Sequence, residues 1–413
     1  MKNNQSQKNI LNGWNQVKLG DIGNSYSGLT GKNKEDFGFG KPFISYMNIY
    51  INWEINSNIN DLVNIKDNDN QNQVKYGDIF FTTSSETPDE VGISSVLLNK
   101  NIGKVYLNSF CFGFRLHNFN ILLPEYSKYF FRAKPFRDKM AIIAQGAIRF
   151  NLSKKYFNEV KLNLPPLPEQ DRIVSVLEAW DKAIENLNKK IEVKKQIKKG
   201  LMQDLLTGKK RLSGFNEKWE ILAIGSIGQV VTGNTPSKRV SSYYGNEFLW
   251  ATALDFNGVY IEDTEIKLSE SGKSVSRVVP SGSVLVTCIA SIGKNAIAKR
   301  SMSFNQQINA IIPNKKHNSE FIYYLIENSF HKLKEVAGGG ALAMISKGVF
   351  EKIKLNFPSL EEQTAIANIL TTSDKEITEL QNKLSIIKNQ KKYLLDNLIT
   401  GTIRTPETLS TKS

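Results

Sequence analysis

The stretch that decides the fold is NLPPLPEQDRIVSVLEAWDKAIENLNKKIEVKKQIKKGLMQDLLTG, which runs from Asn163 to Gly208. The prolines near its start exclude helix before it, the residues that follow are strong helix formers, and a glycine is a natural helix end. The sequence therefore predicts one long helix within residues 165–210.

Apolar residues recur along this helix at alternating steps of four and three, the pattern of a coiled-coil seam. Lys194 and Lys198 interrupt the pattern, and it resumes afterwards. A helix of roughly 35 to 40 residues spans about 55 Å, and its apolar stripe needs a partner. The predicted seam consists of Ile173, Leu177, Trp180, Ile184, Leu187, Ile191, Leu201 and Leu205.

A second copy of this stretch lies 193 residues further on, NFPSLEEQTAIANILTTSDKEITELQNKLSIIKNQKKYLLDNLITG, and ends at Gly401. Ser373 and Lys391 occupy its two off-pattern positions. Because the first helix leads into the second globular stretch and the second helix leaves it, we expect the two helices to pair antiparallel within the chain. The second half of the predicted seam consists of Ile366, Leu370, Ile377, Leu380, Leu384, Ile387, Leu394 and Leu398.

The repeat also extends into the globular stretches. At an offset of 205, Trp14 matches Trp219 and Gly28 matches Gly233, and the offset falls to 193 near the end of each half. The predicted fold class is α+β, with two mixed globular domains, two long helices forming an antiparallel coiled coil, and a pseudo-two-fold repeat that brings the chain end near residue 1. The predicted parts are a first domain 1–164, a helix 165–210, a second domain 211–357, a helix 358–403 and a tail 404–413.

Shorter elements are visible inside each half. GDIFFTTSS and GSVLVTCIAS each follow a turn glycine and have the composition of strands. PEYSKYFFRAKPFRDKM and SEFIYYLIENSFHKLKEV each predict one amphipathic helix, followed by a glycine turn.

The chain carries a formal charge of +14 over 413 residues, which favours an acidic partner such as nucleic acid but also fits basic proteins of ordinary function. Cys111 and Cys288 lie far apart in apolar runs, so we expect no disulfide and a reducing compartment. The three histidines have no ligand-spaced companions, which argues against a metal site. The N-terminus is polar and no stretch is apolar enough to span a membrane, so a soluble cytoplasmic protein is expected.

Motifs for catalysis are absent from the sequence. It contains neither G-x-x-x-x-G-K-[ST] nor a G-x-G-x-x-G after a strand. NLPP at 163–166 superficially resembles the N-P-P-aromatic motif of amino-methyltransferases, but its position favours a helix boundary. The acids beside Pro88 favour a loop turn over a Mg²⁺ site. We therefore predict no catalytic and no metal-binding residue in this chain.

Polar and basic loop residues supply the candidates for DNA contact, because such side chains bind phosphate oxygens and base edges. Ordinary solvated loops are the alternative for each of them, and the lysines at 194–199 favour a solvated helix face. The predicted DNA-binding residues are Lys32, Lys34, Ser84, Ser85, Arg149, Thr235, Lys238, Arg239, Lys294, Gln306, Gln307 and Lys347.

Taken together, the paired P-x-L-x-E-Q openings and T-G closings around two globular stretches resemble the specificity subunit of a type I restriction-modification enzyme. TGNTPSKR, SVLVTCIASIGKNAIA and FNQQINAII are similar to segments of one target-recognition class in that family, and NSFCFGFRLHN with TTSSETPDEVG is similar to another. The resemblance covers essentially the whole chain.

This resemblance implies a non-catalytic subunit whose two target-recognition domains read the halves of a split site on double-stranded DNA. It also implies that the coiled coil sets the gap between the two half-sites and docks two modification (methyltransferase) subunits. Two restriction (motor-nuclease) subunits would then complete the restriction enzyme. S-adenosylmethionine, ATP and Mg²⁺ are then expected in the partner subunits. The loops differ between the two domains, so we expect an asymmetric site. A coiled-coil scaffold without DNA contact and a free-standing methyltransferase or nuclease remain as alternatives.

Overall fold

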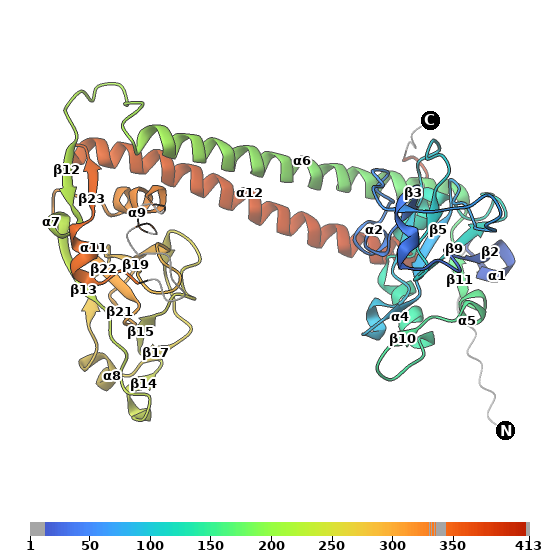
Figure 1. The fold of residues 1–413 in the computed structure, drawn as a ribbon, viewed down its shortest axis with the longest axis horizontal. Helices are drawn as coiled ribbons and strands as arrows, with labels where there is room; N and C mark the ends of the chain where they lie inside the picture. Colours follow the sequence, from blue (N-terminus) through green and yellow to red (C-terminus); the bar gives the residue numbers. More distant parts are fainter. Residues whose placement is uncertain (1–12, 330, 332, 334, 336–343, 410–413) are drawn as a thin grey trace. The chain divides into compact units, whose positions relative to one another are not determined.

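The computed structural model describes residues 13–329, 331, 333, 335 and 344–409. They fall into two compact units, unit 1 within residues 1–186 and 384–413 and unit 2 within residues 187–383. Figure 1 draws both units and labels many of their elements. The boundary between the units runs through the middle of both long helices, α6 (Leu167–Leu205) and α12 (Leu360–Thr400), whereas the division expected from the sequence runs at the helix ends.

Unit 1 is built on a four-stranded antiparallel sheet with small sheets around it. GDIFFTTSS indeed contains a central strand of this sheet, β5. The order β2-β9-β5-β7 is formed by Gly23–Ser27, Cys111–Leu116, Ile79–Thr82 and Ser94–Val96. The other strands are β4-β3-β8 (Leu62–Val63, Phe37–Ile44, Tyr106–Leu107), β1-β11 (Asn15–Lys18, Lys161–Leu164) and β10-β6 (Phe150–Asn151, Ser84–Ser85).

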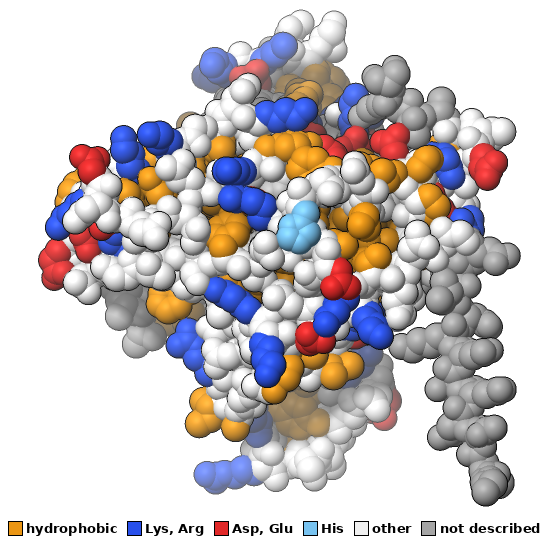
Figure 2. All heavy atoms as spheres, turned by 90° about the vertical axis from the view of Figure 1, so that its right-hand side faces the viewer, with side chains coloured by type: hydrophobic (Ala, Val, Ile, Leu, Met, Phe, Trp, Pro, Cys, Tyr) orange, Lys and Arg blue, Asp and Glu red, His pale blue; other side chains and the backbone are white. Residues whose placement is uncertain are grey.

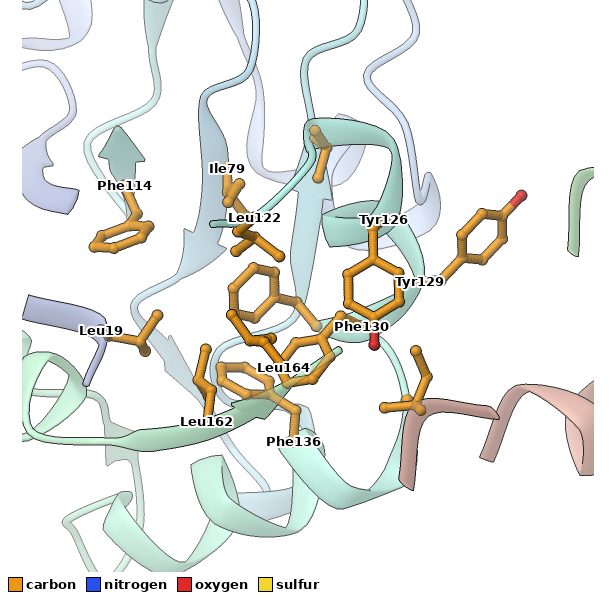
Figure 3. Packing of buried hydrophobic residues seen from close by; sticks show 14 of the residues in the cluster. Leu19, Ile79, Phe114, Leu122, Tyr126, Tyr129, Phe130, Phe136, Leu162 and Leu164 are labelled. Carbon is orange, nitrogen blue, oxygen red and sulfur yellow. The ribbon is translucent and has the colours of Figure 1, made fainter. Parts of the chain in front are cut away.

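The helices of unit 1 cover this sheet and close an aromatic core. Figure 3 shows part of that core, where side chains from the sheet and from α3 and α4 converge. The ring of Phe157 lies 4.8 Å from that of Phe81 and 5.1 Å from that of Phe112. The helical elements are α1 (Leu19–Ile22), η1 (Lys34–Asp36), α2 (Tyr46–Ile51), η2 (Pro88–Glu90), α3 (Pro124–Phe130), α4 (Lys134–Ile143) and α5 (Lys154–Asn158).

The single helix expected over PEYSKYFFRAKPFRDKM is wrong, because this stretch forms the two helices α3 and α4. Pro135 has no backbone N–H to donate and its ring clashes with the preceding turn, so one continuous helix cannot pass through it. The chain becomes extended at Ala133, and α4 then starts with the proline in its first turn, where no donor is needed.

The described residues of unit 2 form two five-stranded sheets and one further strand pair. The strand expected in GSVLVTCIAS is β19. The first sheet is β13-β22-β19-β20-β16 (Gly228–Thr232, Ile308–Pro313, Val284–Thr287, Asn295–Ala298, Tyr260–Ile261). The second is β14-β17-β15-β21-β18 (Tyr244–Gly245, Lys267–Leu268, Phe248–Ala251, Met302–Phe304, Val278–Val279), and the pair is β12-β23 (Glu220–Ala223, Lys354–Phe357). The helical elements among the described residues of unit 2 are α7 (Ile224–Ile227), η3 (Ser241–Tyr243), α8 (Glu270–Ser274), α9 (Ser319–Asn328) and α11 (Lys347–Lys352).

The sequence repeat is a structural repeat. The pair β1-β11 aligns Asn15 with Leu164, and β12-β23 aligns Glu220 with Phe357, which is the same register at the offsets found in the sequence. The glycines that open β2 and β13 are needed for close approach, because a Cβ atom would lie 2.6 Å from the Arg115 carbonyl oxygen in unit 1 and 2.2 Å from the Ile312 carbonyl oxygen in unit 2. Matched glycines therefore preserve one frame in both units.

The two long helices run antiparallel within each unit, as expected. In unit 2 the Lys194 Nζ atom lies 2.8 Å from Glu376, and four residues later Lys198 Nζ lies 2.8 Å from Asp374, so the numbering falls along one helix as it rises along the other. In unit 1 the equivalent ion pair joins Lys391 to Asp181. The lysines that interrupt the apolar pattern are thus held by acids of the facing helix.

The residues of the predicted seam are all buried or half-buried in the structure. Ile173 and Leu177 join the core of unit 1 together with Leu398, and Ile366 and Leu370 join the core of unit 2. The seam thus merges at its ends with the two cores, so each helix pair is packed against its own globular part.

Candidate nucleic-acid interface

Three of the predicted DNA-binding residues, Ser84, Ser85 and Arg149, come together in unit 1 around a cavity of about 750 Å³. We call it the reading cavity. The small sheet β10-β6 brings the residues together, since Phe150 pairs with Ser85 and thereby fixes the neighbouring Arg149 at the rim. The remaining lining residues are Tyr46, Met47, Tyr50, Glu86, Glu90, Phe110 and Ile148.

The polar side of the reading cavity is organised by Glu90. Its carboxylate accepts hydrogen bonds from the Tyr50 hydroxyl at 2.8 Å and from the Ser85 hydroxyl at 3.1 Å. The bond from Tyr50 is the main reason why the pKa of Glu90 lies below its ordinary value. Glu90 ends the short helix η2, so the acids beside Pro88 form a turn, as expected.

Arg137 holds that turn from behind. Its guanidinium donates to the Asp89 carbonyl at 2.7 Å and also to the carbonyls of Val91 and Gly92. Burial lowers the pKa of Arg137 to about 10. Because the guanidinium of Arg137 donates its hydrogen bonds to backbone carbonyls, Arg137 positions the cavity wall and does not face a ligand.

The rim of the reading cavity is unusually apolar for an exposed surface. Ile148 is 91% exposed, Phe110 58% and Met47 54%. Apolar groups beside an arginine, hydroxyls and a carboxylate match the edges of base pairs, which present a methyl group on thymine together with hydrogen-bond donors and acceptors. Phosphates alone would need only cations and hydrogen-bond donors.

Charge does not mark such a site by itself. Figure 2 shows a face of the molecule on which Lys and Arg side chains are spread among polar and hydrophobic ones rather than gathered in one patch. The hollowed surfaces of the units therefore carry more information about binding than the net charge.

The equivalent position in unit 2 holds Gln306 and Gln307. The Cys288 amide donates to the Gln307 carbonyl at 2.8 Å, just as the Thr83 amide donates to the Phe110 carbonyl at 3.0 Å in unit 1. Gln307 thus replaces Phe110 on the shared frame. Two of the predicted residues also meet here, because the Thr235 hydroxyl donates to the Gln306 side chain. Unit 2 offers amides where unit 1 offers a phenyl ring.

Backbone strain is found at the same position of unit 2. Among the described residues, Ala290 is the only residue other than glycine with a positive φ, at 62°. It follows Ile289, which bridges to Met344 in the way that β6 bridges to β10 in unit 1. Strain of this kind collects at functional sites and costs on the order of 1–3 kcal/mol. Residues 336–343, which the repeat matches to the loop of Arg149, lie outside the described residues.

The structure does not bring the other predicted residues to these surfaces. Lys32 forms an ion pair with Asp69 and its side chain is only 6% exposed. Lys347 pairs with Glu351 at 3.6 Å, and Lys294 lines a separate cavity of about 400 Å³. Lys34 lies in η1, and Lys238 and Arg239 are exposed in the loop after β13.

Sequence reasoning missed the aromatic and apolar part of the reading cavity, Tyr46, Tyr50, Phe110 and Ile148. Apolar residues in a sequence are expected in the core, and only the fold shows that these lie at a rim. A usable signal existed for Phe110, because the matching position of the second copy is the polar Gln307.

Among the described residues, no group of three His, Cys, Asp or Glu side chains could hold a metal ion, and no helix has the length and apolar character needed to cross a membrane. Both cysteines are free and buried, and burial raises the pKa of Cys111 to about 12. Neither thiol has the lowered pKa of a nucleophile.

Comparison with known proteins points to one family. A family model described as type I restriction modification DNA specificity domain matches residues 12–195 and 216–389. The putative type I restriction enzyme MjaX specificity subunit of Methanocaldococcus jannaschii is 28% identical over 342 residues, which cover 76% of this chain and 78% of that protein. In fold, the chain is similar to the HsdS subunit from Thermoanaerobacter tengcongensis, with a TM-score of 0.54 at 18% identity over 97% of this chain and 100% of that one. It is also similar to a chain from a solved structure on complex assembly and conformational transition of the type I R-M system, with a TM-score of 0.66 at 17% identity over 96% of this chain and 100% of that one.

Proposed function

Because the chain belongs to the family of type I restriction-modification DNA specificity subunits, we propose that it reads a double-stranded DNA site in two parts, one with each unit. The supporting observation is the pair of equivalent surfaces that carry different side chains on one frame, Phe110 with Arg149 in unit 1 and Gln307 in unit 2. Different side chains select different base edges. The two half-sites therefore differ in sequence.

The chain is a non-catalytic subunit, in keeping with the specificity subunits to which it is related. The methyl transfer, with its S-adenosylmethionine, belongs to modification subunits, and ATP-driven motor and nuclease work with Mg²⁺ belongs to restriction subunits. This division of labour assigns to the present chain only the selection of the site and the assembly of its partners. We place the complex in the cytoplasm, where two free buried thiols stay reduced.

An apolar groove on the helix pair of unit 1 is the best candidate for docking a modification subunit. Trp180, Tyr393 and Leu394 line it, together with two amide side chains, around a volume of about 520 Å³. Tyr393 is 63% exposed although it belongs to a helix whose seam is covered. In unit 2 the first helix exposes Val193 and Ile197 in a comparable way, at 53% and 51%. One modification subunit on each unit gives the proposed count of two.

We further propose that the long helices fix the gap between the half-sites. A stiff helix lengthens by about 1.5 Å per residue, so the gap in the DNA site depends on the number of residues in α6 and α12. Inserting one seam repeat of seven residues into each helix would lengthen the gap without changing either half-site.

Sequencing the methylated adenines of a host that carries this chain with its modification subunit tests the proposal. We expect one motif with two unlike halves separated by a fixed gap of unread bases. A palindromic motif, or methylation without any sequence preference, contradicts the proposal.

Two rival functions make different measurable claims. A scaffold without DNA contact predicts no salt-dependent DNA binding by the assembled complex, whereas a DNA reader loses affinity with salt at a log-log slope of several units. A free-standing enzyme predicts methyl transfer or DNA cleavage by the purified chain alone.

A further inference from the structure

A second cavity in unit 1, of about 760 Å³, lies between the globular part and the helix pair of that unit. We call it the basic cavity, because seven Lys and Arg side chains line it against only three carboxylates. From this cavity we propose that Lys388 and Lys392 bind phosphates of the DNA strand that flanks the half-site read by unit 1. The inference rests on the proposed function and adds a binding site to it.

Five of the seven cations already have partners inside the protein. Lys128 lies 3.2 Å from Glu54, Lys134 lies 2.7 Å from Asp138, and Lys391 pairs with Asp181 and lies over the ring of Trp53. The guanidinium groups of Arg132 and Arg137 donate to backbone carbonyls.

Lys388 and Lys392 differ from these five. In the part of the chain that the structure describes, neither has a hydrogen-bond or ion-pair partner, and both are exposed on α12. Residues four apart lie on one face of a helix, about 5–6 Å from each other at the Cβ atoms. The two lysines thus present a pair of strongly hydrated point charges, which suits phosphate oxygens.

The basic cavity and the reading cavity share one wall. Helix α2 supplies Tyr50 to the reading cavity, and the residues just after it, from Asn52 to Glu54, line the basic cavity. Arg132 fixes this wall by donating to the carbonyls of Ile49 at 2.7 Å and Asn52 at 2.8 Å. The six residues of α2 span about 9 Å, close to the roughly 12 Å width of the DNA major groove. A ligand whose base edges face one cavity therefore has a phosphate strand near the other.

Lys388 and Lys392 recur in unit 2 as Lys195 and Lys199 at the offset of 193, but their surroundings differ. Lys195 lies 2.8 Å from Glu192, whereas Ser385 takes the place of Glu192 in unit 1. The Tyr129 hydroxyl donates to Asp181 at 2.7 Å in unit 1, and the Tyr324 hydroxyl donates to Asp374 at 2.7 Å in unit 2. Three residues after each tyrosine, unit 1 has Arg132 and unit 2 has Glu327. Glu327 lies 4.0 Å from Lys198 in unit 2, whereas Arg132 occupies the matching position in unit 1, so the surroundings of the matching lysines are more positive in unit 1.

The experiment compares the complete complex with modification subunits, carrying Lys388→Gln and Lys392→Gln together, with a matched control carrying Lys375→Gln and Lys383→Gln. The control removes two exposed lysines of the same helix that do not line the cavity. Glutamine keeps helix propensity close to that of lysine. Affinity for a duplex bearing the methylated motif is measured from 50 to 200 mM salt.

We expect the log-log salt slope of the Lys388/Lys392 variant to fall by about 2, since each lost phosphate contact removes about 0.9, while the methylated motif and the control slope stay unchanged. An unchanged slope, an equal fall in the control, or an altered motif overturns the proposal. If the Lys388/Lys392 variant no longer co-purifies with the modification subunits, the proposal is also overturned, because the basic cavity would then bind a protein partner. If the complex without any substitution shows no salt-dependent DNA binding, that different result contradicts the proposed function itself.

Discussion

Arg404 and Glu169, 235 residues apart in the chain, are joined by a bidentate ion pair in which the Arg404 Nη2 atom lies 2.7 Å from Oε2 of Glu169. The indole of Trp14 donates to the same carboxylate at 3.2 Å. Unit 2 repeats the arrangement with Arg211 and Trp219 on Glu362. The glutamate of each P-x-L-x-E-Q opening thus ties the start of a globular part, the start of a long helix and the segment after the facing helix into one cluster.

Glu169→Gln is expected to destabilise unit 1 by about 1–2 kcal/mol, because it keeps the shape of a side chain that is 3% exposed but removes its charge-assisted hydrogen bonds. The partly exposed Arg404 regains water, so the loss stays below that of a fully buried pair. Urea unfolding followed by tryptophan fluorescence measures the change. The matched control is Glu159→Gln, which breaks an exposed pair with Lys18 and should leave the midpoint where it was.

The sequence predicts this cluster only in part. The repeat singles out Glu169 and Glu362, because a motif that recurs at a fixed offset has a common purpose, but nothing local connects either glutamate to an arginine beyond the facing helix. The contacts of the adjacent glutamine could not be predicted from the sequence for the same reason. Gln170 accepts from the Leu123 amide at 2.9 Å and donates to the Pro165 carbonyl at 2.9 Å, and only the fold brings residue 123 to it.

Periodicity decided the parts that were predicted well. Seven-residue patterns depend on local geometry, so the long helices could be derived from Ile173 to Leu205 and the copy of that stretch. Their antiparallel pairing followed from the order of helices and globular stretches along the chain. Surface chemistry depends on contacts distant in sequence. Lys32 is of a residue type that often contacts DNA, but it forms an ion pair with Asp69. Ile148 is of a residue type expected in the core, but it is 91% exposed.

Phe157→Ala is expected to cost unit 1 about 3–5 kcal/mol, because the ring is fully buried and packs on Phe81 and Phe112, so its loss leaves a cavity between α5 and the sheet. Hydrogen exchange resolved by peptide should show faster exchange in β5 and β9. Tyr156→Ala, at a neighbouring side chain that is 45% exposed, is the control and should leave exchange in these strands unaltered. Equal effects of the two variants would count against the described core.

Stability of unit 2 is expected to fall on acidification below about pH 6.5, because burial lowers the pKa of His317 from its ordinary value of 6.5. Between the lowered folded pKa and 6.5, the unfolded chain binds more protons than the folded one, so stability rises with pH in this window and is lost as the pH falls through it. His317→Phe keeps the ring contact with Phe357 and should flatten this part of the pH profile of urea unfolding. His117→Phe, at an exposed site, should retain the slope; if both variants retain it, His317 is not its source.

Arg149→Ala in the assembled complex is expected to weaken binding to the complete DNA site by about 1–3 kcal/mol and to relax the methylated motif in one half only, because a base contact belongs to a single half-site. Methylome sequencing together with binding to duplexes altered base by base reads both effects. Lys155→Ala removes an exposed cation of unit 1 that does not line the reading cavity, and should change neither. Gln307→Ala should relax the opposite half, since Gln307 takes the place of Phe110 in unit 2. A weakened complex whose motif stays intact would make Arg149 a phosphate contact, and the reading of bases would then rest on Phe110, Ser84 and Ser85.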